Sequence, residues 1–281
     1  MHSKPHYIEG KLVTRIVLVF GAAYFLSYAF RAINAVIAPA LIADMNLSNA
    51  DLGLLSSAYF VGFASLQLPL GIWLDKYGSR RTESSLLLFA ALGAAMFASS
   101  STLAGLWTGR AMIGVGVSAC LMAPFKAYRS WFAPERQSQL ASWMLVFGSV
   151  GALSTTVPVA ALLPVIGWRG VFWLMSGLIL LAAALLYFRL GPVEQERMLA
   201  NATATDASEA LSYWAIVTHP YFRRMALLGG VHQGGFMAVQ TLWAGPWMLN
   251  VLGLSVNQTS DRKSTRLNSS HVSESRMPSS A

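Results

Sequence analysis

Long apolar runs, each close to 20 residues and bounded by charged or turn-forming residues, dominate this sequence. A helix needs about 20 residues to cross a hydrocarbon core of about 30 Å, and in lipid a helix satisfies its own backbone groups. The sequence therefore predicts an all-α, polytopic membrane protein with seven spans. They are expected at residues 16–41, 52–74, 84–102, 104–127, 140–163, 170–188 and 225–250.

Charge and cysteine content exclude several classes of protein. Only 11% of the 281 residues are charged and 55% are hydrophobic, whereas soluble domains carry about 25% charged residues. The net charge of +8 is scattered over short connections without a recognition motif, so we expect the lipid bilayer as a partner and no nucleic acid. The single cysteine, Cys120, rules out a disulfide within the chain, and we expect no metal or cofactor.

The first apolar run could be mistaken for a secretory signal, because Lys4, Lys11 and Arg15 precede it. Arg31 interrupts the run, which is also too long for such a signal, so we interpret it as a retained first helix. Basic residues then set the orientation, because they gather in alternate connections and the other connections contain only Arg169. We therefore expect a cytoplasmic N-terminus and a multi-pass protein of the cell membrane.

The short loop from Gly71 to Arg81 carries the pattern G-x-x-x-D-K-x-G-x-R-R. It joins two predicted spans so closely that only a tight hairpin fits, and glycine allows such a turn. The pattern resembles the signature loop between helices 2 and 3 of the major facilitator superfamily, although an ordinary positively charged loop is the alternative. The residues of this conformational motif are Gly71, Asp75, Gly78, Arg80 and Arg81.

The resemblance implies a bundle of six helices, built as two inverted repeats of three, followed by a seventh helix. It also implies that Asp75 stabilises an outward-open state at a helix end, with Arg81 as its expected local partner. A solvated loop acid is the alternative for Asp75. Lys126 and Arg129, at the end of the fourth span, are expected to anchor that end to lipid headgroups, with a role in substrate binding as the alternative.

A second resemblance to the same superfamily lies in the fourth span, where Arg110 is followed by Gly114 and Gly116. In the superfamily such an arginine is tied to proton coupling or to packing within the first bundle, and both roles stay open here. The glycines also resemble a dinucleotide fingerprint, but no strand precedes them. Arg110-Ala111-Met112 faintly repeats Arg31-Ala32-Ile33 of the first span.

Arg31 is the leading candidate for substrate binding, because a charge inside a span is costly unless it faces a cavity or a partner. Tyr24, Tyr28 and Arg31 share one helical face, with Asn34 at its edge. The alternative is that Arg31 reaches the outer membrane surface. Arg110 is expected at a similar depth and facing the same cavity. No Asp or Glu falls inside a predicted span, so a substrate anion could supply the missing negative charge.

The seventh span adds two candidates. His232, among paired glycines, could take part in proton coupling because its ordinary pKa is near 6.5, or it could simply pack against a helix. Gln240 is a candidate polar group of the same cavity.

Four segments are predicted along the chain. Residues 1–190 form a six-helix bundle, 191–221 a cytoplasmic linker, 222–256 the first helix of a second bundle, and 257–281 a tail. From Asp261 the tail resembles a translated adapter rather than protein sequence, and a genuine disordered tail is the alternative. We therefore expect a truncated transporter that ends one helix into its second half.

The sequence thus predicts a secondary active transporter of a small anionic or zwitterionic metabolite, proton-coupled, working by alternating access and monomeric at full length. No catalytic motif is present, so we expect no enzyme. Two alternatives are a seven-helix receptor or sensor and a half-transporter module that does not transport.

Overall fold

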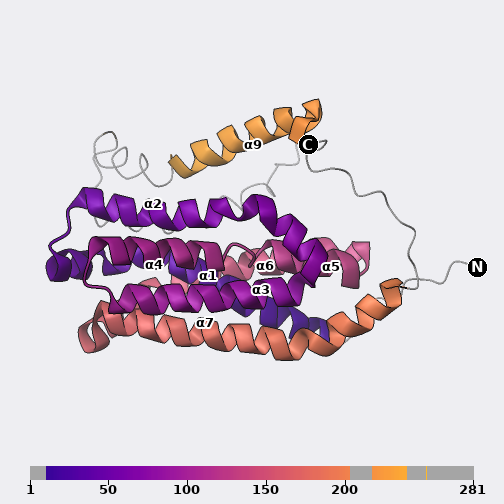
Figure 1. The fold of residues 1–281 in the computed structure, drawn as a ribbon, viewed down its shortest axis with the longest axis horizontal. Helices are drawn as coiled ribbons and strands as arrows, with labels where there is room; N and C mark the ends of the chain where they lie inside the picture. Colours follow the sequence, from indigo (N-terminus) through magenta and orange to yellow (C-terminus); the bar gives the residue numbers. More distant parts are fainter. Residues whose placement is uncertain (1–10, 203–216, 239–250, 252–281) are drawn as a thin grey trace, which may run out of the picture. The chain divides into compact units, whose positions relative to one another are not determined.

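The computed structural model describes residues 11–202, 217–238 and 251, and the described part of the chain is helical without strands (Figure 1). The chain divides into two units, residues 1–205 and 206–281, and each is considered by itself. The first unit contains α1 (Lys11–Met45), α2 (Asn49–Ser65), α3 (Gln67–Ser99), α4 (Leu103–Gly116), α5 (Met122–Trp131), α6 (Pro134–Ser154) and α7 (Thr156–Ala202), and the second contains α9 (Pro220–Ala238).

The helices of the first unit correspond to the first six predicted spans. Three stretches of the described chain are long and apolar enough by themselves to cross a membrane: Leu12–Met45, Gln67–Ser99 and Pro158–Glu194. The remaining spans are built from pieces, since α2 continues into the start of α3, α4 into α5, and α6 into the start of α7. The predicted all-α, multi-pass fold is therefore confirmed. The seventh span is described as α9 up to Ala238, and residues 239–250 lie outside the described residues.

Two glycines reverse the chain inside α3 and α7. Gly78 has φ 80° and ψ 169°, and Gly167 has φ 64° and ψ 174°. This backbone region is essentially restricted to glycine, because a side chain would clash there. The predicted hairpin in the 71–81 loop is confirmed, and it turns at Gly78.

Prolines explain why three spans are broken in the middle. Proline is the third residue of the helix that follows each break: Pro69 in α3, Pro124 in α5 and Pro158 in α7. A proline ring clashes with the carbonyl four residues before it, but it is tolerated in the first turn of a helix, where no N–H is needed. Accordingly α2 ends at Ser65 and α6 ends at Ser154, four residues before their prolines.

The second and fifth spans are related by a constant offset of 89 residues. Pro69 corresponds to Pro158, Gly78 to Gly167 and Arg80 to Arg169. Their packing corresponds as well: a Cβ atom at Gly62 would lie 2.2 Å from the carbonyl oxygen of Ala111, and one at Gly151 would lie 2.3 Å from that of Phe25. The second span thus packs closely on the fourth, and the fifth on the first, as inverted three-helix repeats require.

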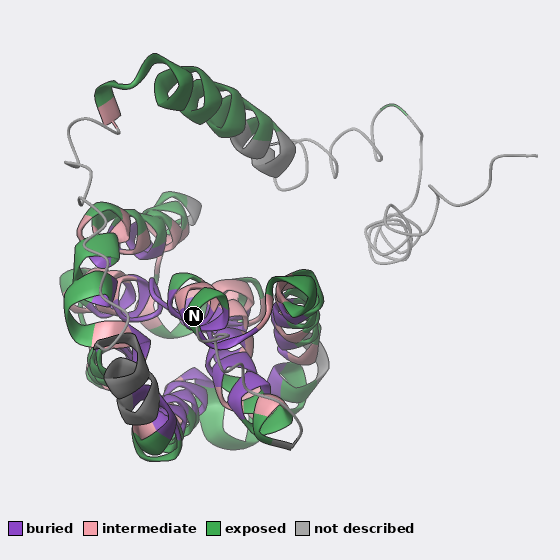
Figure 2. Cartoon of the chain, turned by 90° about the vertical axis from the view of Figure 1, so that its right-hand side faces the viewer, coloured by how far each residue is buried: buried purple, intermediate pink, exposed green. Residues whose placement is uncertain are grey.

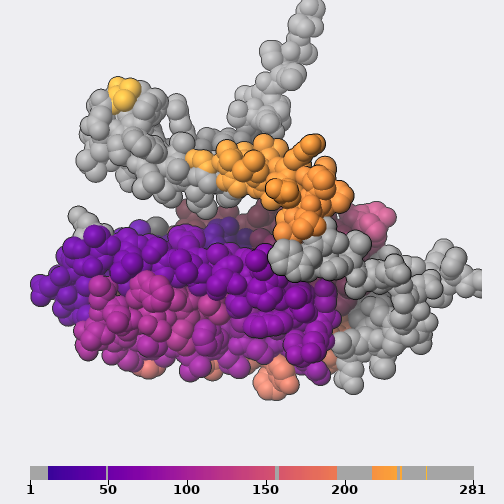
Figure 3. Space-filling view, turned by 45° about the horizontal axis from the view of Figure 1, so that its top comes forward, coloured from indigo at the N-terminus to yellow at the C-terminus, as the bar shows by residue number. Residues whose placement is uncertain are grey.

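The core lies between these helices. Viewed along the bundle, buried residues occupy the sides of the helices that face one another, and exposed residues lie on the outer sides (Figure 2). The aromatic rings of Phe30, Phe97 and Phe172 pack against one another in this core, with 4.2 Å between the centroids of Phe97 and Phe172. In the space-filling view α2, α3 and α4 form one continuous surface (Figure 3).

Candidate functional site

Arg31 lies in α1 among aromatic rings contributed by α1 and α2. The carbon at the centre of its guanidinium lies 4.8 Å from the ring centroid of Tyr28 and 5.5–5.9 Å from those of Tyr59, Phe60 and Phe63. Its Nε is buried without a hydrogen-bond partner, and no carboxylate pairs with it among the described residues. Arg31 is therefore held inside the bundle by ring faces, which attract cations, rather than extended to the membrane surface.

The face of α1 predicted around Arg31 forms as expected. The rings of Tyr24 and Tyr28 lie 5.0 Å apart, and Asn34 Nδ2 donates to Ser56 Oγ at 3.3 Å. Tyr24 is buried, whereas Ala35, one turn beyond Arg31, is exposed. Along this face the side chains are therefore buried or half-buried before Arg31 and exposed one turn after it.

Arg110 occupies a different environment from the one predicted for it. Its side chain, 1% exposed, lies in the core between the rings of Tyr59, Phe97 and Phe172, and its Nη1 donates to the Phe30 carbonyl oxygen at 3.2 Å. The expectation that Arg110 faces an open cavity together with Arg31 is wrong, because the aromatic residues of α2, α3 and α7 enclose it. Both arginines nevertheless lie against the ring of one residue, Tyr59, at 5.9 Å for Arg31 and 5.7 Å for Arg110.

Asp75 pairs with Lys126 of α5 and not with Arg81. The expectation of an Arg81 partner is therefore wrong, whereas a contact of Lys126 or Arg129 with lipid headgroups stays a prediction. Both residues border a groove of about 700 Å³ between the first part of α3 and α5, in which Arg129 also lies. Gly71 lines the same groove, and no atom would lie within 4 Å of a Cβ added there.

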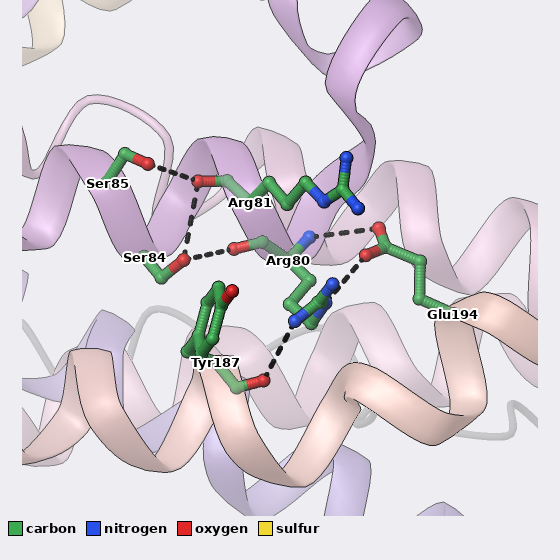
Figure 4. Close-up of polar contacts among 6 residues, drawn as sticks. All are labelled: Arg80, Arg81, Ser84, Ser85, Tyr187 and Glu194. Carbon is green, nitrogen blue, oxygen red and sulfur yellow. Dashed lines mark hydrogen bonds and ion pairs between the residues drawn. The ribbon is translucent and has the colours of Figure 1, made fainter.

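Arg80 connects the Gly78 turn to the far end of α7 (Figure 4). Its Nε lies 2.9 Å from Glu194 Oε2, its backbone N–H donates to Glu194 Oε1 at 3.2 Å, and its Nη1 donates to the Tyr187 carbonyl oxygen at 3.1 Å. The ion pair is largely buried, with side-chain exposures of 13% and 8%. Sequence reasoning missed Glu194 as a partner, because it lies 114 residues away in a segment predicted to be linker.

Two candidates on the seventh span cannot be related to this bundle. His232 is exposed within the second unit. Gln240 lies outside the described residues. Their roles remain predictions.

Sequence reasoning also missed a buried acid. Glu83 of α3 is 0% exposed, and neither carboxyl oxygen has a hydrogen-bond partner. The inference that no Asp or Glu lies inside a span is therefore wrong. Because Glu83 follows Arg80, Arg81 and Thr82, the sequence pattern places it in the polar loop. The turn at Gly78 instead places it in the second turn of the returning helix.

Inverted three-helix repeats, glycine turns at both ends and an arginine inside the first span define a polytopic helical membrane protein of the transporter type. The model of the Major Facilitator Superfamily matches residues 20–263, and the chain belongs to this superfamily. The predicted membership is thereby confirmed, and it leaves the seven-helix receptor without support.

Individual relatives are distant. The chain is 24% identical over 268 residues to the probable sulfoacetate transporter SauU of Cupriavidus necator, covering 89% of this chain and 61% of that protein. It is 28% identical over 178 residues to the hexuronate transporter of Escherichia coli K12, covering 62% and 40%. Its fold is similar to the crystal structure of a D-xylose-proton symporter, with a TM-score of 0.60, 17% identity, and 90% and 65% coverage. The chain thus spans 40–61% of the length of these two curated relatives.

Proposed function

We propose that the full-length protein is a secondary active transporter of a small organic anion, and that Arg31 binds the anionic group. The observation that carries this proposal is the guanidinium of Arg31, inside a membrane bundle and without a carboxylate partner among the described residues. A carboxylate or sulfonate offers planar or tetrahedral oxygens that a guanidinium binds with two parallel hydrogen bonds. Tyr24, Tyr28 and Asn34 extend the same face of α1 and would contact the rest of the substrate.

The relatives favour the same substrate class. Both the sulfoacetate and the hexuronate of their names are organic anions at neutral pH. The fold neighbour is named as a proton symporter, which supports proton coupling for this chain. In this proposal the substrate meets Arg31 between two bundles, the protein rocks between outward-open and inward-open states, and the N-terminus lies in the cytoplasm of a cell-membrane protein that is monomeric at full length.

The motif around Gly78 would then control the rocking. Asp75 and Lys126 form an ion pair at the border of the groove, whereas Arg80 and Glu194 connect the loop to α7. We propose that Asp75–Lys126, with 80% of the Asp75 side chain exposed, is the pair that rearranges between states, and that Arg80–Glu194 persists. His232 and Gln240 are proposed as contributions of the seventh helix.

Uptake in cells that express the full-length gene tests the proposal. We expect accumulation of labelled hexuronate or sulfoacetate, and at least a tenfold loss of uptake in Arg31→Gln. Arg136→Gln, which removes an exposed cation at the start of α6, is the matched control and is expected to transport normally. Equal uptake by Arg31→Gln and wild-type protein would exclude Arg31 as the anion-binding group. No uptake of any organic anion by correctly inserted wild-type protein would instead exclude the proposed substrate class.

A further inference from the structure

Glu83 is a charged residue type in a place where a charge is costly. It lies in α3, fully buried, and no cation or hydrogen-bond donor lies within hydrogen-bond geometry of either carboxyl oxygen among the described residues. An ionised carboxylate without a counter-charge is strongly destabilised in such surroundings, whereas the neutral acid can be accommodated. The surroundings of Glu83 therefore favour the form that carries a proton.

No cation compensates Glu83 among the described residues. Of the titratable groups on the elements around it, the thiol of Cys120 and the ring of Tyr128 in α5 are the ones that interact with its carboxyl. The Tyr128 hydroxyl donates to Met144 Sδ at 3.4 Å. The basic residues nearby have other partners or are exposed: Arg80 pairs with Glu194 of α7, Lys126 of α5 with Asp75, Arg110 of α4 binds the Phe30 carbonyl oxygen, and Arg81 and Arg129 are exposed.

The neighbour of Glu83 is a break in a membrane-spanning segment. Cys120 belongs to residues 117–121, which separate α4 from α5 and form turns, in which the N–H groups of Ser118 and Cys120 each donate to the carbonyl oxygen three residues earlier, at 3.2 Å. Irregular backbone at membrane depth persists only where protein buries it or where it lines a water-filled space. Here Gln67, at the break between α2 and α3, donates to the Ser118 carbonyl oxygen at 3.4 Å, so that two interrupted spans meet two residues from Cys120.

Polar groups also connect this position with Arg31. The thiol of Cys120 interacts with the Ser27 hydroxyl. The Ser27 carbonyl oxygen in turn accepts a hydrogen bond of 3.4 Å from the hydroxyl of Tyr59, and the Tyr59 ring lies against Arg31. We therefore expect a change in packing at the 117–121 break to alter the position of the Tyr59 ring beside Arg31, at the proposed anion site.

We propose that Glu83 is the proton-binding site of this bundle, protonated in the observed packing and deprotonated when α4 and α5 move about the 117–121 break. The step is a simple acid–base exchange, in which an O–H bond forms on the carboxylate as water or hydronium gives up its proton, and the reverse step returns the proton to water. The inference rests on the proposed transport function for its role in coupling, but proton binding itself does not depend on any substrate.

Infrared spectroscopy of the full-length protein in lipid nanodiscs tests proton binding directly, because a protonated carboxyl has its own C=O stretching band. We expect this band near neutral pH in wild-type protein, its reversible loss at alkaline pH, and its absence from Glu83→Gln. Glu135→Gln, which removes an exposed carboxyl of α6, is the matched control and should keep the band. A band that Glu83→Gln leaves unchanged, or that persists at every pH at which the protein is folded, would overturn the proposal.

Uptake driven by a pH gradient then tests coupling. Glu83→Gln resembles the neutral acid in shape, so we expect it to fold with the wild-type unfolding temperature and to lose at least tenfold of the gradient-driven accumulation. Glu83→Asp keeps a carboxyl and should retain a pH-dependent uptake. If Glu83→Gln keeps the full response to the gradient, Glu83 has no coupling role although transport stands. If the infrared result holds and no anion is transported, the transport function fails and the proton site stands.

Discussion

The Gly78 turn and the Gly167 turn are corresponding parts of two inverted repeats, and they are stabilised differently. Each has glycine in the same backbone conformation, and each has an arginine two residues later. At the Gly78 turn Arg80 binds Glu194 in a largely buried pair. At the Gly167 turn Arg169 binds Asp44 in a pair with side-chain exposures of 40% and 45%. Arg169 also lies over the Trp168 ring, and Trp168 Nε1 donates a hydrogen bond of 3.0 Å to Asp44 Oδ2.

The two turns share their backbone conformation but differ in how far their ion pairs are buried. Removing one partner of a buried ion pair strongly destabilises the folded protein, whereas an exposed pair contributes little to the free energy of unfolding. The Gly78 turn is thus fixed to α7 by a buried ion pair and lies beside a second pair, Asp75–Lys126, for which we propose the switching role. The Gly167 turn carries no second ion pair among the described residues.

Replacing the two glycines should give the largest effects on stability and the clearest difference between the two turns. Gly78→Ala and Gly167→Ala both place a side chain in a conformation restricted to glycine, at about 1–3 kcal/mol. A Cβ at Gly78 would also lie 2.3 Å from Glu194 Oε1, whereas no atom would lie within 4 Å of one at Gly167. We expect the Gly78 variant to lose more unfolding free energy in detergent. In a Glu194→Ala background the two variants should cost the same, and a persistent difference would refute the clash.

Replacing the arginines should have the next largest effect. Arg80→Gln leaves Glu194 buried without its cation, which costs about 3 kcal/mol, so we expect a clear fall in the unfolding temperature. Arg169→Gln removes an exposed pair and should change it little. Equal falls in the unfolding temperature of the two variants would mean that the burial of the ion pair does not determine its contribution to stability.

The smallest effect is expected at the start of α2, at the same end of the bundle as Gly167. Ser48 and Asp51 form a capping box, in which Asp51 Oδ2 accepts from the Ser48 hydroxyl at 2.7 Å and from its N–H at 2.8 Å. These hydrogen bonds hold the pKa of Asp51 below its ordinary value. Their contribution is present above the unfolded pKa of about 3.9 and is lost as the pH falls through the lower folded pKa.

Thermal unfolding of Asp51→Asn measures this contribution. The variant should unfold slightly below the wild type near neutral pH, and the difference should vanish in acid. Thr102→Ala, at the N-cap of α4, removes a hydroxyl that accepts from the Gly105 N–H at 3.2 Å, and its effect should not vary with pH. A difference for Asp51→Asn that grows in acid would contradict the capping role.

The sequence was sufficient for the features that depend on local chemistry. Apolar length predicts the spans, and glycine at residue 78 predicts the hairpin. The three mid-span breaks also follow from local chemistry, because the ring of each proline, Pro69, Pro124 and Pro158, clashes with the carbonyl group four residues before it. The predicted spans nevertheless run through all three breaks.

The features that sequence reasoning missed depend on which helices meet. Lys126 reaches Asp75 and Glu194 reaches Arg80 only because α5 and α7 pack on the two sides of the Gly78 turn. Tyr59 is one of many aromatic residues in the spans, and nothing local shows that both Arg31 and Arg110 lie against its ring. The burial of Glu83 does not follow from the sequence, because an acidic residue next to a charged loop is expected to be solvated. Its burial depends on where the chain turns, at Gly78.

The central claim, that Arg31 binds an organic anion, is tested most directly by calorimetric titration of the full-length protein with hexuronate and with sulfoacetate. We predict binding by the wild type and by Arg136→Gln, at least tenfold weaker binding by Arg31→Gln, equivalent to about 1.4 kcal/mol, and an intermediate affinity for Arg31→Lys. An anion that binds to Arg31→Gln as tightly as to the wild type would contradict the account.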